Sequence, residues 1–578
     1  MREELIKRGK DELVKVRRKS RALYWTVALF SLFANLLMLT GPMYMLQVYD
    51  RVLGSGSEET LIALSILVVF LYGVMGVLDH TRGRIMARVG ARFQDDLDRR
   101  VFDAVVRKSA VAPDVKTNGS LADLEAVQRL ISAPVLMAAF DLPWTPIFFA
   151  AIFVFHPMLG WLALCGAAVL IVIALANQLL SRASQVKSAV AGQTATAISD
   201  QIRTEAEMVQ AMGMREAAFN RWQTARGEAL TQQMHATDVG GTFTSMTKSI
   251  RLFLQSAMLG LGAYLVLQEQ MTPGAMIAGS ILLGRALAPV EMAINQWAMV
   301  QRGRAGWNSL ALLLGAVSPE AERTELPKPK AKLDAKGLTV VPPGEKAAAL
   351  KSINFSLQPG QAMGIIGPSG AGKSSVARTL MGLWQPAGGY IRLDGAALDQ
   401  YGTETLGKHI GYLPQRVQLF DGTIAENIAR LSASPDDAKV VAAAKMAAAH
   451  EMILELPKGY DTPISAGQMR LSGGQMQRIG LARALYDDPV IVVLDEPNSN
   501  LDNVGSQALN HAIREMKKRG RSVIIMAHRP NAIQECDTLL VLDNGMRMGF
   551  GPKDEVMKGM VANAKQIQQA PVASGGVS

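Results

Sequence analysis

The chain has 578 residues, a length that predicts several domains rather than one core. Hydrophobic residues make up 49% of it and are concentrated in the first half, which indicates membrane spans and argues against a wholly soluble protein. The net charge of +10 does not require nucleic acid as a partner, because the basic residues flank the hydrophobic segments, and two cysteines support neither a disulfide framework nor a zinc site.

Six segments are apolar enough to cross a bilayer, which takes about 20 residues each. They lie at about Ala22–Leu46, Thr60–Leu78, Pro134–Phe155, Met158–Leu180, Phe253–Leu267 and Pro273–Val300. Gly41-Pro42 predicts a kink in the first. Lys and Arg crowd the start of the chain and the loops after the second and fourth segments, whereas 47–59 holds only Arg51. The positive-inside rule therefore places both termini and the second half of the chain in the cytoplasm.

The two long cytoplasmic loops have helical patterns and are expected to extend the spanning helices. Within them, 120–130 and 213–222 are short amphipathic pieces, either coupling helices that dock on the second half or ordinary solvated helix, and the architecture favours docking. Arg285 and Glu291 fall inside the sixth segment, where an ion usually faces a cavity or a partner. For Arg285, a polar conduit and snorkelling to the interface both remain open. Tyr24-Trp25 is expected to be an interfacial anchor.

A glycine-rich loop follows the apolar stretch 362–366 and matches GxxxxGK[ST], so its backbone N–H groups can close around phosphate at the start of a helix. Lys373 is expected to reach the β- and γ-phosphates of ATP, and Ser374 to bind Mg²⁺. The nucleotide-binding residues expected here are Gly367, Pro368, Ser369, Gly370, Ala371, Gly372, Lys373, Ser374 and Ser375.

A second apolar strand, 491–494, ends in Asp495-Glu496. Asp495 is placed to hold Mg²⁺, directly or through water, and Glu496 to polarise the attacking water. Either carboxylate alone could be a helix cap, but two of them after a buried strand and downstream of a phosphate loop indicate an ATPase.

Between these motifs lies Leu471–Gln475 (LSGGQ), and the stretch from about 337 to 559 resembles the nucleotide-binding domain of ABC transporters. The resemblance implies further roles, residue by residue. Gln415 corresponds to the Q-loop glutamine that touches Mg²⁺ and assists catalysis, Ser472 and Gly474 to signature residues that contact the γ-phosphate held by the opposite subunit, Asp502 to the D-loop, and His528 to the switch histidine. The stretch 338–343 lacks the usual aromatic partner of adenine, so adenine is expected to pack on Val340 or Val341 instead.

The expected fold is therefore an all-α six-helix membrane domain of the type IV ABC exporter kind, fused to an α/β P-loop ATPase domain. Its expected divisions are a basic cytoplasmic tail (1–21), the transmembrane domain (22–317), a linker (318–336), the nucleotide-binding domain (337–560) and a disordered tail (561–578).

Three stretches of the membrane half indicate which group of ABC exporters the chain resembles. Pro42–Leu61, Asp141–Gly160 and Gly284–Glu291 are similar to the type I secretion ATPases of Gram-negative bacteria, of the PrtD-type that exports alkaline proteases. The resemblance implies a homodimer in the inner membrane that exports unfolded proteins bearing a C-terminal signal, with a periplasmic membrane-fusion adaptor and an outer-membrane channel as partners. An exporter of lipids or small hydrophobic molecules is the alternative. A regulatory module that gates a channel is disfavoured, because Glu496, His528 and the signature glycines are intact.

Overall fold

The structure is a computed structural model and describes residues 2–111, 121–320, 323–324, 326–464, 471–498, 503–528 and 530–559. The chain forms two compact units, which correspond to the membrane half and the ATPase half of the sequence. The first unit comprises Met1–Ser109 and Val115–Pro319, and the second comprises Ala110–Asp114 and Glu320–Ser578.

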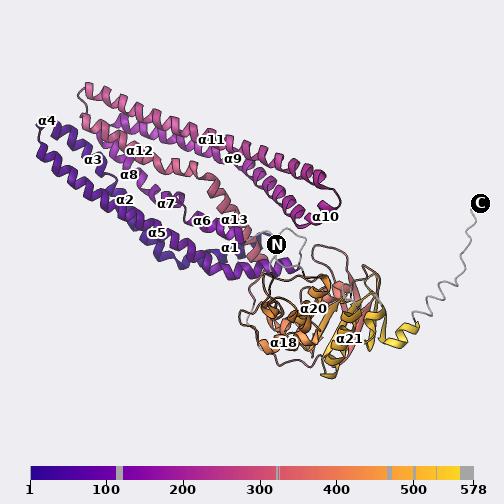
Figure 1. The fold of residues 1–578 in the computed structure, drawn as a ribbon. Helices are drawn as coiled ribbons and strands as arrows, with labels where there is room; N and C mark the ends of the chain where they lie inside the picture. The colour runs from indigo at the N-terminus through magenta and orange to yellow at the C-terminus, as the bar shows by residue number, and fades with distance from the viewer. Residues whose placement is uncertain are drawn as a thin grey trace, which may run out of the picture. The chain divides into compact units, whose positions relative to one another are not determined.

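Six helical segments of the first unit are long and apolar enough to span a membrane, which confirms the expected number. Among the described residues they are Arg21–Ser55, Glu58–Val111, Pro134–Phe155, Pro157–Thr204, Arg215–Leu267 and Pro273–Asn295. Three of them are continuous helices of about 50 residues: α5 (Glu58–Val111), α9 (Pro157–Thr204) and α11 (Arg215–Leu267). At 1.5 Å per residue such helices reach about 70–80 Å, whereas the hydrocarbon core is only about 30 Å thick. The spans therefore do continue as long helices beyond the membrane, as expected (Figure 1).

Proline positions explain the breaks in two spans. The first span ends its helix α2 (Arg21–Leu37) shortly before Gly41-Pro42, and restarts as α3 (Thr40–Gln47) followed by a π-helix and the short α4 (Leu53–Ser55). The third span divides into α7 (Pro134–Asp141) and α8 (Thr145–Phe155) around a single turn that contains Pro143. Because proline lacks an N–H and its ring crowds the preceding turn, each break falls where the helical hydrogen bonds cannot continue.

Arg82 on α5 is 5% exposed and ties α5 to α2 and α7. Its Nη1 donates to Ser31 Oγ at 2.8 Å and to Asp141 Oδ1 at 2.7 Å, and its Nη2 pairs with Asp79 Oδ1 at 2.7 Å. Asn35 Nδ2 donates to the same Asp141 oxygen at 2.7 Å. Because a buried charge without its partner is costly, this network fixes the three helices against one another.

The two charged residues expected inside the sixth span have different surroundings. Glu291 on α12 (Pro273–Asn295) pairs with Arg251 on α11, Oε2 to Nε at 3.3 Å. Arg285 is exposed and forms no ion pair with any residue in the described ranges. Glu291 thus faces a partner, and Arg285 presents an exposed side chain.

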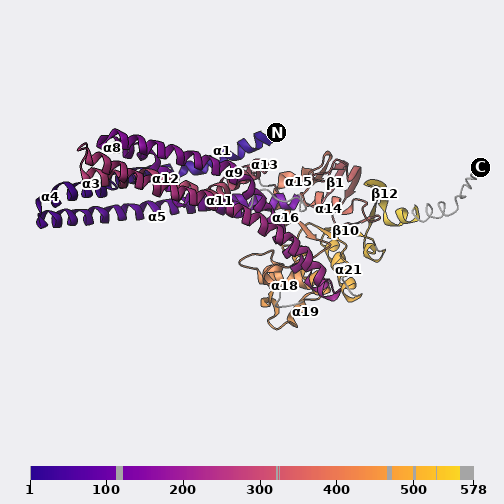
Figure 2. The same cartoon turned by 90° about the horizontal axis from the view of Figure 1, so that it is seen from above.

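Long helices α9 and α11 run side by side, as Figure 1 and Figure 2 show, and the short α10 (Ala206–Ala211) joins them. The amphipathic piece at 213–222 is not a helix of its own. Gly213 closes the turn after α10 with φ +65°, a conformation that glycine adopts readily. From Arg215 onward no proline interrupts the sequence of this stretch, so these residues become the first turns of α11. In contrast, 120–130 does contain a separate helix, α6 (Leu121–Ile131), which packs on α13 (Trp297–Ala316).

The basic start of the chain is a packed helix and not a free tail. Helix α1 (Arg2–Lys19) lies along α13 with Leu13 fully buried between them. The two helices approach so closely at Gly9 that an added Cβ would lie 1.9 Å from Ala311 O, so only glycine fits there. The charged face of α1 is thereby held next to the first span.

The second unit is built on a six-stranded sheet in the order β12-β11-β3-β10-β9-β6, with a four-stranded antiparallel sheet in the order β2-β1-β4-β5. The strands of the larger sheet are β3 (Ala362–Ile366), β6 (Ile410–Leu413), β9 (Ile491–Asp495), β10 (Ser522–Ala527), β11 (Thr538–Asp543) and β12 (Met546–Pro552). Those of the smaller sheet are β1 (Leu333–Val340), β2 (Leu350–Leu357), β4 (Gly388–Leu393) and β5 (Ala396–Ala397). All pairs of the larger sheet except β11 with β12 are parallel. Strand β1 begins at Leu333, inside the range expected to be linker.

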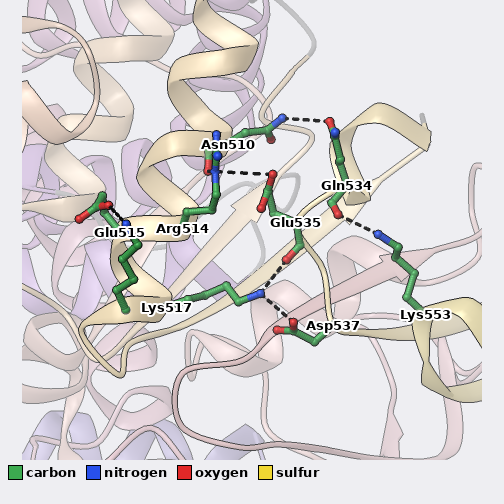
Figure 3. Close-up of polar contacts among 9 residues, drawn as sticks. Asn510, Arg514, Glu515, Lys517, Gln534, Glu535, Asp537 and Lys553 are labelled. Atoms are coloured by element: carbon green, nitrogen blue, oxygen red, sulfur yellow. Dashed lines mark hydrogen bonds and ion pairs between the residues drawn. The ribbon is translucent and has the colours of Figure 1, made fainter.

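Residues on the faces of β9 and β10 are fully buried, as expected for parallel strands covered by helices on both sides. Helix α21 (Asn503–Lys518) is held to the segment before β11 by the polar contacts in Figure 3. Lys517 Nζ donates to Asp537 Oδ1 at 2.7 Å and to Glu535 O at 3.1 Å, while Asp537 Oδ2 accepts Ala362 N at 2.8 Å. This network locks the amino ends of β3 and β11, at the edge opposite the motifs.

Candidate active site

The phosphate loop connects β3 to α14 (Lys373–Leu380) as the sequence predicted. Gly372 has φ +102°, and a Cβ there would lie 2.7 Å from the Leu350 side chain and 2.9 Å from Ala349 O, so a side chain is excluded. Lys373 Nζ donates to the carbonyl oxygens of Gly367 and Pro368, both at 2.8 Å. The loop therefore closes around the ammonium group at the amino end of a helix, a geometry suited to an anion.

Within that loop the two serines differ in exposure. Ser374 lies in the first turn of α14 with an exposed side chain, whereas Ser375 is 9% exposed. Ser375 O accepts a hydrogen bond from Thr379 Oγ1 at 2.8 Å inside the helix. Of the pair, Ser374 is the one whose hydroxyl is open to a ligand.

Glu496 stands at the centre of the polar contacts at the carboxyl ends of the strands. Its Oε1 is 2.8 Å from His528 Nε2, and its Oε2 accepts Gln415 Nε2 at 3.0 Å. Its backbone has φ +50°, which is uncommon for a residue other than glycine, and its N–H donates to Met526 O at 3.0 Å. Strand β9 thus ends at Asp495, and Glu496 is held in place by the neighbouring strand β10.

His528 links Glu496 to the phosphate loop. It follows β10, which lies between β3 and β9, and its Nδ1 is 3.4 Å from Lys373 Nζ. A neutral imidazole with its proton on Nε2 satisfies both contacts, because it donates to the Glu496 carboxylate and accepts from the Lys373 ammonium group. The structure therefore joins Gln415, Glu496, His528 and Lys373 into one chain of polar contacts.

Asp495 is 6% exposed, and the pKa values around it reflect that burial. Burial raises the pKa of the Asp495 carboxyl, and the adjacent Glu496 charge raises it further. Burial lowers the pKa of the Lys373 ammonium group, against the opposing effect of Glu496 and Asp495. One buried carboxyl group, one partly exposed carboxyl group and one buried lysine at the same edge form a site that a divalent cation and a phosphate chain would both stabilise.

The signature motif begins helix α20 (Gly473–Leu485). Ser472 Oγ accepts Gln475 N at 3.2 Å, and Gln475 Oε1 accepts Ser472 N at 2.8 Å, which is a capping box. Ser472 is exposed, and α20 packs against α17 (Ile424–Ile428), α18 (Asp437–Met446) and β6. The expected signature residues are thus at an exposed helix start near the β6 edge of the sheet. Asp502, the expected D-loop residue, lies outside the described residues.

Two residues that hold α20 were not found from the sequence. Buried Gln477 donates its Nε2 to Pro497 O, just after Asp495-Glu496. The Arg430 guanidinium donates to four carbonyls, of which Arg483 O, Ala484 O and Tyr486 O belong to the carboxyl end of α20 and the residue after it. A cation at a helix carboxyl end is stabilising. Neither residue lies in a motif that marks it in a single sequence.

The two valines expected to hold adenine differ in burial. Val340 is fully buried in the core between the strands, which corrects the expectation that adenine could pack on it. Val341, just after β1, is partly exposed. Of these two valines, only Val341 offers surface to a base.

Comparison with known proteins agrees with this arrangement. Residues 350–499 match the ABC transporter family, and residues 24–288 match the ABC transporter transmembrane region. The type I secretion system ATP-binding protein PrsD of Rhizobium meliloti (strain 1021) is 42% identical over 555 residues, which covers 96% of this chain and 95% of the relative. The leukotoxin translocation ATP-binding protein LktB of Mannheimia haemolytica is 26% identical, with 95% of this chain and 79% of the relative covered.

An ATP-dependent lipid A-core flippase of Alkalilimnicola ehrlichii is 31% identical, with 86% of each chain covered. The solved structure of a bacterial Atm1-family ABC exporter with ATP bound matches with a TM-score of 0.77 over 96% of this chain and 99% of the other. At 23% identity this structural match establishes the fold alone, and it confirms the expected exporter architecture. Because the 42% identity runs through both units, the chain belongs to the ABC transporter family and, within it, to the type I secretion ATP-binding proteins.

Proposed function

We propose that this multi-pass membrane protein is the inner-membrane ATPase of a type I secretion system, and that it exports unfolded proteins recognised by a C-terminal signal. ATP hydrolysis coupled to transport follows from the family. The proposal that the cargo is protein rests on the 42% identity to PrsD, which extends across the membrane unit as well as the ATPase unit. The ATPase motifs alone are shared with exporters of other cargo, such as the flippase relative.

The working unit in this proposal is a homodimer. The Lys373 loop follows β3, whereas Ser472 starts a helix that packs on α17, α18 and β6, at one end of the sheet. Ser472 is exposed and Gly474 is partly exposed at the start of α20, and the amino end of that helix favours an anion. A second copy facing the first would place its Ser472 against the γ-phosphate on the first copy's Lys373. A periplasmic adaptor and an outer-membrane channel complete the proposed assembly.

The roles of the site residues follow from their contacts. Lys373 neutralises the phosphates, and Glu496 is the general base that orients the attacking water. His528 holds the Glu496 carboxylate by its Nε2 contact at 2.8 Å and contacts Lys373 with its other nitrogen. Gln415 uses Nε2 for Glu496, which leaves its Oε1 free. Hydrolysis at this base converts the closed pair of copies to an open pair, and the long helices carry the change to the spans.

The residues expected to bind Mg²⁺ form a fitting set. Ser374 offers an exposed hydroxyl, Asp495 a buried carboxylate with raised pKa, and Gln415 a free amide oxygen. Oxygen ligands of this kind suit Mg²⁺, which also neutralises charge that develops on the β- and γ-phosphates. The raised pKa of Asp495 is itself a reason for a cation, because a nearby positive charge would relieve the cost of ionising it.

ATPase activity in lipid vesicles tests the cargo class. The lipid composition is held constant while an unfolded C-terminal segment of a secreted protease is added, with a segment of the same composition in scrambled order as the control. We expect a saturable change in rate, about twofold or more, with the native segment only. A protein that ignores both segments but responds to small hydrophobic molecules or to added lipid would instead be an exporter of the flippase kind.

Replacing Glu496 tests the general base. We expect Glu496→Gln to keep ATP binding, because Lys373 and its loop are unchanged, and to lower the turnover rate about 100-fold or more. The measurement is phosphate release beside equilibrium binding of a fluorescent ATP analogue. Glu455→Gln, at an exposed position on the same unit, is the control that should leave both unchanged. Fast hydrolysis by Glu496→Gln would contradict the assignment of Glu496 as the general base.

Replacing Asp495 tests two effects of its carboxyl group, namely the cost of its charge to folding stability and its binding of Mg²⁺ with ATP. Because its pKa is raised in the folded state, the folded protein holds a proton that the unfolded chain has already released, so the free energy of unfolding falls as pH rises through that window. We expect Asp495→Asn to raise the unfolding temperature of the nucleotide-free protein at pH 8, by about 2–4 °C per kcal/mol relieved, and to raise it less at pH 5.5. The same variant should lose the extra stabilisation that Mg²⁺ with ATP gives the wild type. A variant that is equally destabilised at both pH values contradicts this reading, as does one that Mg²⁺ with ATP still stabilises fully.

A further inference from the structure

A cavity of about 420 Å³ lies in the first unit, where the junction of α1 and α2 meets α6, α7 and α13. We call it the arginine cavity. Tyr24, Phe140 and Trp307 supply aromatic wall, and the Tyr24 and Phe140 rings stack with centroids 6.4 Å apart. Arg17 and Arg304 are the charged residues of its lining within the described ranges. The cavity thus combines an apolar interior with two cationic groups.

Neither arginine forms an ion pair with an acidic residue in the described part of the chain. Arg17 places its guanidinium 5.8 Å from the centre of the Trp307 ring, and Arg304 is exposed. Other arginines near these helices do have partners, since Arg302 pairs with Asp123 at 3.0 Å and Arg100 with Glu12 at 3.0 Å. The arginine cavity is therefore a place where positive charge has been left without a carboxylate, and an anion with an apolar part would complement it.

The arginine cavity lies at the boundary of the spans. Tyr24 is in the first turn of the first span, and Leu136 and Phe140 are in the early turns of the third. The neighbouring Trp25 is 69% exposed, as suits an interfacial anchor. Helix α1, which ends just before this point, carries eight Lys and Arg residues against four acidic ones. The cavity mouth is thus at the depth of lipid headgroups, on the side that the positive-inside rule makes cytoplasmic.

A second cavity of about 450 Å³ adjoins the first, because Leu130 and Leu136 line both. Its lining is mainly aliphatic, from α6, α7, α9, α12 and α13, with Asn177 and Gln178 as polar residues and Trp297 as an aromatic one. The walls of both cavities are helices whose backbone groups are bonded within the helix, so a peptide chain would find few partners for its amides there. An alkyl chain needs none.

From these features we propose that the arginine cavity binds an anionic phospholipid. The phosphate lies between Arg17 and Arg304, and an acyl chain follows the apolar wall past Leu136 into the second cavity. Basic pockets between spanning helices on the cytoplasmic side are suited to such headgroups. The bound lipid holds α1 and α13 to the start of the first and third spans. This site is independent of the cargo class, so its failure would leave the proposed export function untouched.

Native mass spectrometry of the full-length protein tests the site. The protein is titrated with phosphatidylglycerol and, separately, with phosphatidylcholine of the same chains. We expect the wild type to retain phosphatidylglycerol preferentially, and Arg17→Gln with Arg304→Gln to weaken that binding about fivefold for each arginine removed. Lys15→Gln with Arg18→Gln removes the same charge from exposed positions outside the cavity lining and should leave the binding unchanged. Thermal unfolding checks that each variant is folded, and Arg17→Gln alone serves if the double variant is not.

Three results would overturn the proposal. One is a wild type that shows no preference for phosphatidylglycerol, and another is equal loss in the cavity and control variants, which would indicate surface charge only. The third is displacement of the lipid by the C-terminal segment of a secreted protein together with loss of that segment's binding in the cavity variant. In that case the occupant would be cargo and not lipid.

Discussion

The parallel pairing of β6, β9, β10 and β3 is the constraint on which the active site depends. Parallel strands end at the same edge, so four residues that are up to 155 positions apart are brought within hydrogen-bonding distance of one another without any local connection: Gln415, Glu496, His528 and Lys373. At the opposite edge, hydrogen bonds of Lys517 and Asp537 hold the amino ends of β3 and β11. The polar site residues therefore lie at the carboxyl ends of the strands, and this structural network lies at the amino ends.

In the proposed dimer, the site of one chain is completed by the signature helix of the other. The signature helix α20 is held at its carboxyl end by Arg430 and in its interior by Gln477, which bonds to Pro497 just beyond Glu496. Its amino end is capped by the Ser472 side chain and is exposed. In the proposed dimer, a contact of that end with the partner's nucleotide would reach the segment after Glu496 through the hydrogen bond from Gln477 to Pro497 O.

Sequence reasoning recovered the parts that depend on local pattern and missed those that depend on distant contacts. Six spans and the phosphate loop follow from hydropathy and from glycine positions, and both were correct. The amphipathic piece at 213–222 forms the first turns of α11, and its pattern alone could not tell a separate short helix from the start of a long one. Arg82 and Arg430 could not be identified, since each is defined by partners on other elements. Val340 shows the same limit, because its burial depends on strand pairing.

Cross-linking between two copies tests most directly whether the site is shared. Cysteines replace Ser369 in the phosphate loop and Ser472 in the signature, in a chain that also carries Cys165→Ser, Cys536→Ser and Glu496→Gln. The account predicts that ATP with Mg²⁺ produces a cross-linked product of two chains, which is absent without nucleotide and absent when either cysteine is missing. A bond formed only within one chain, or no product between chains at any ATP concentration, would contradict the shared site.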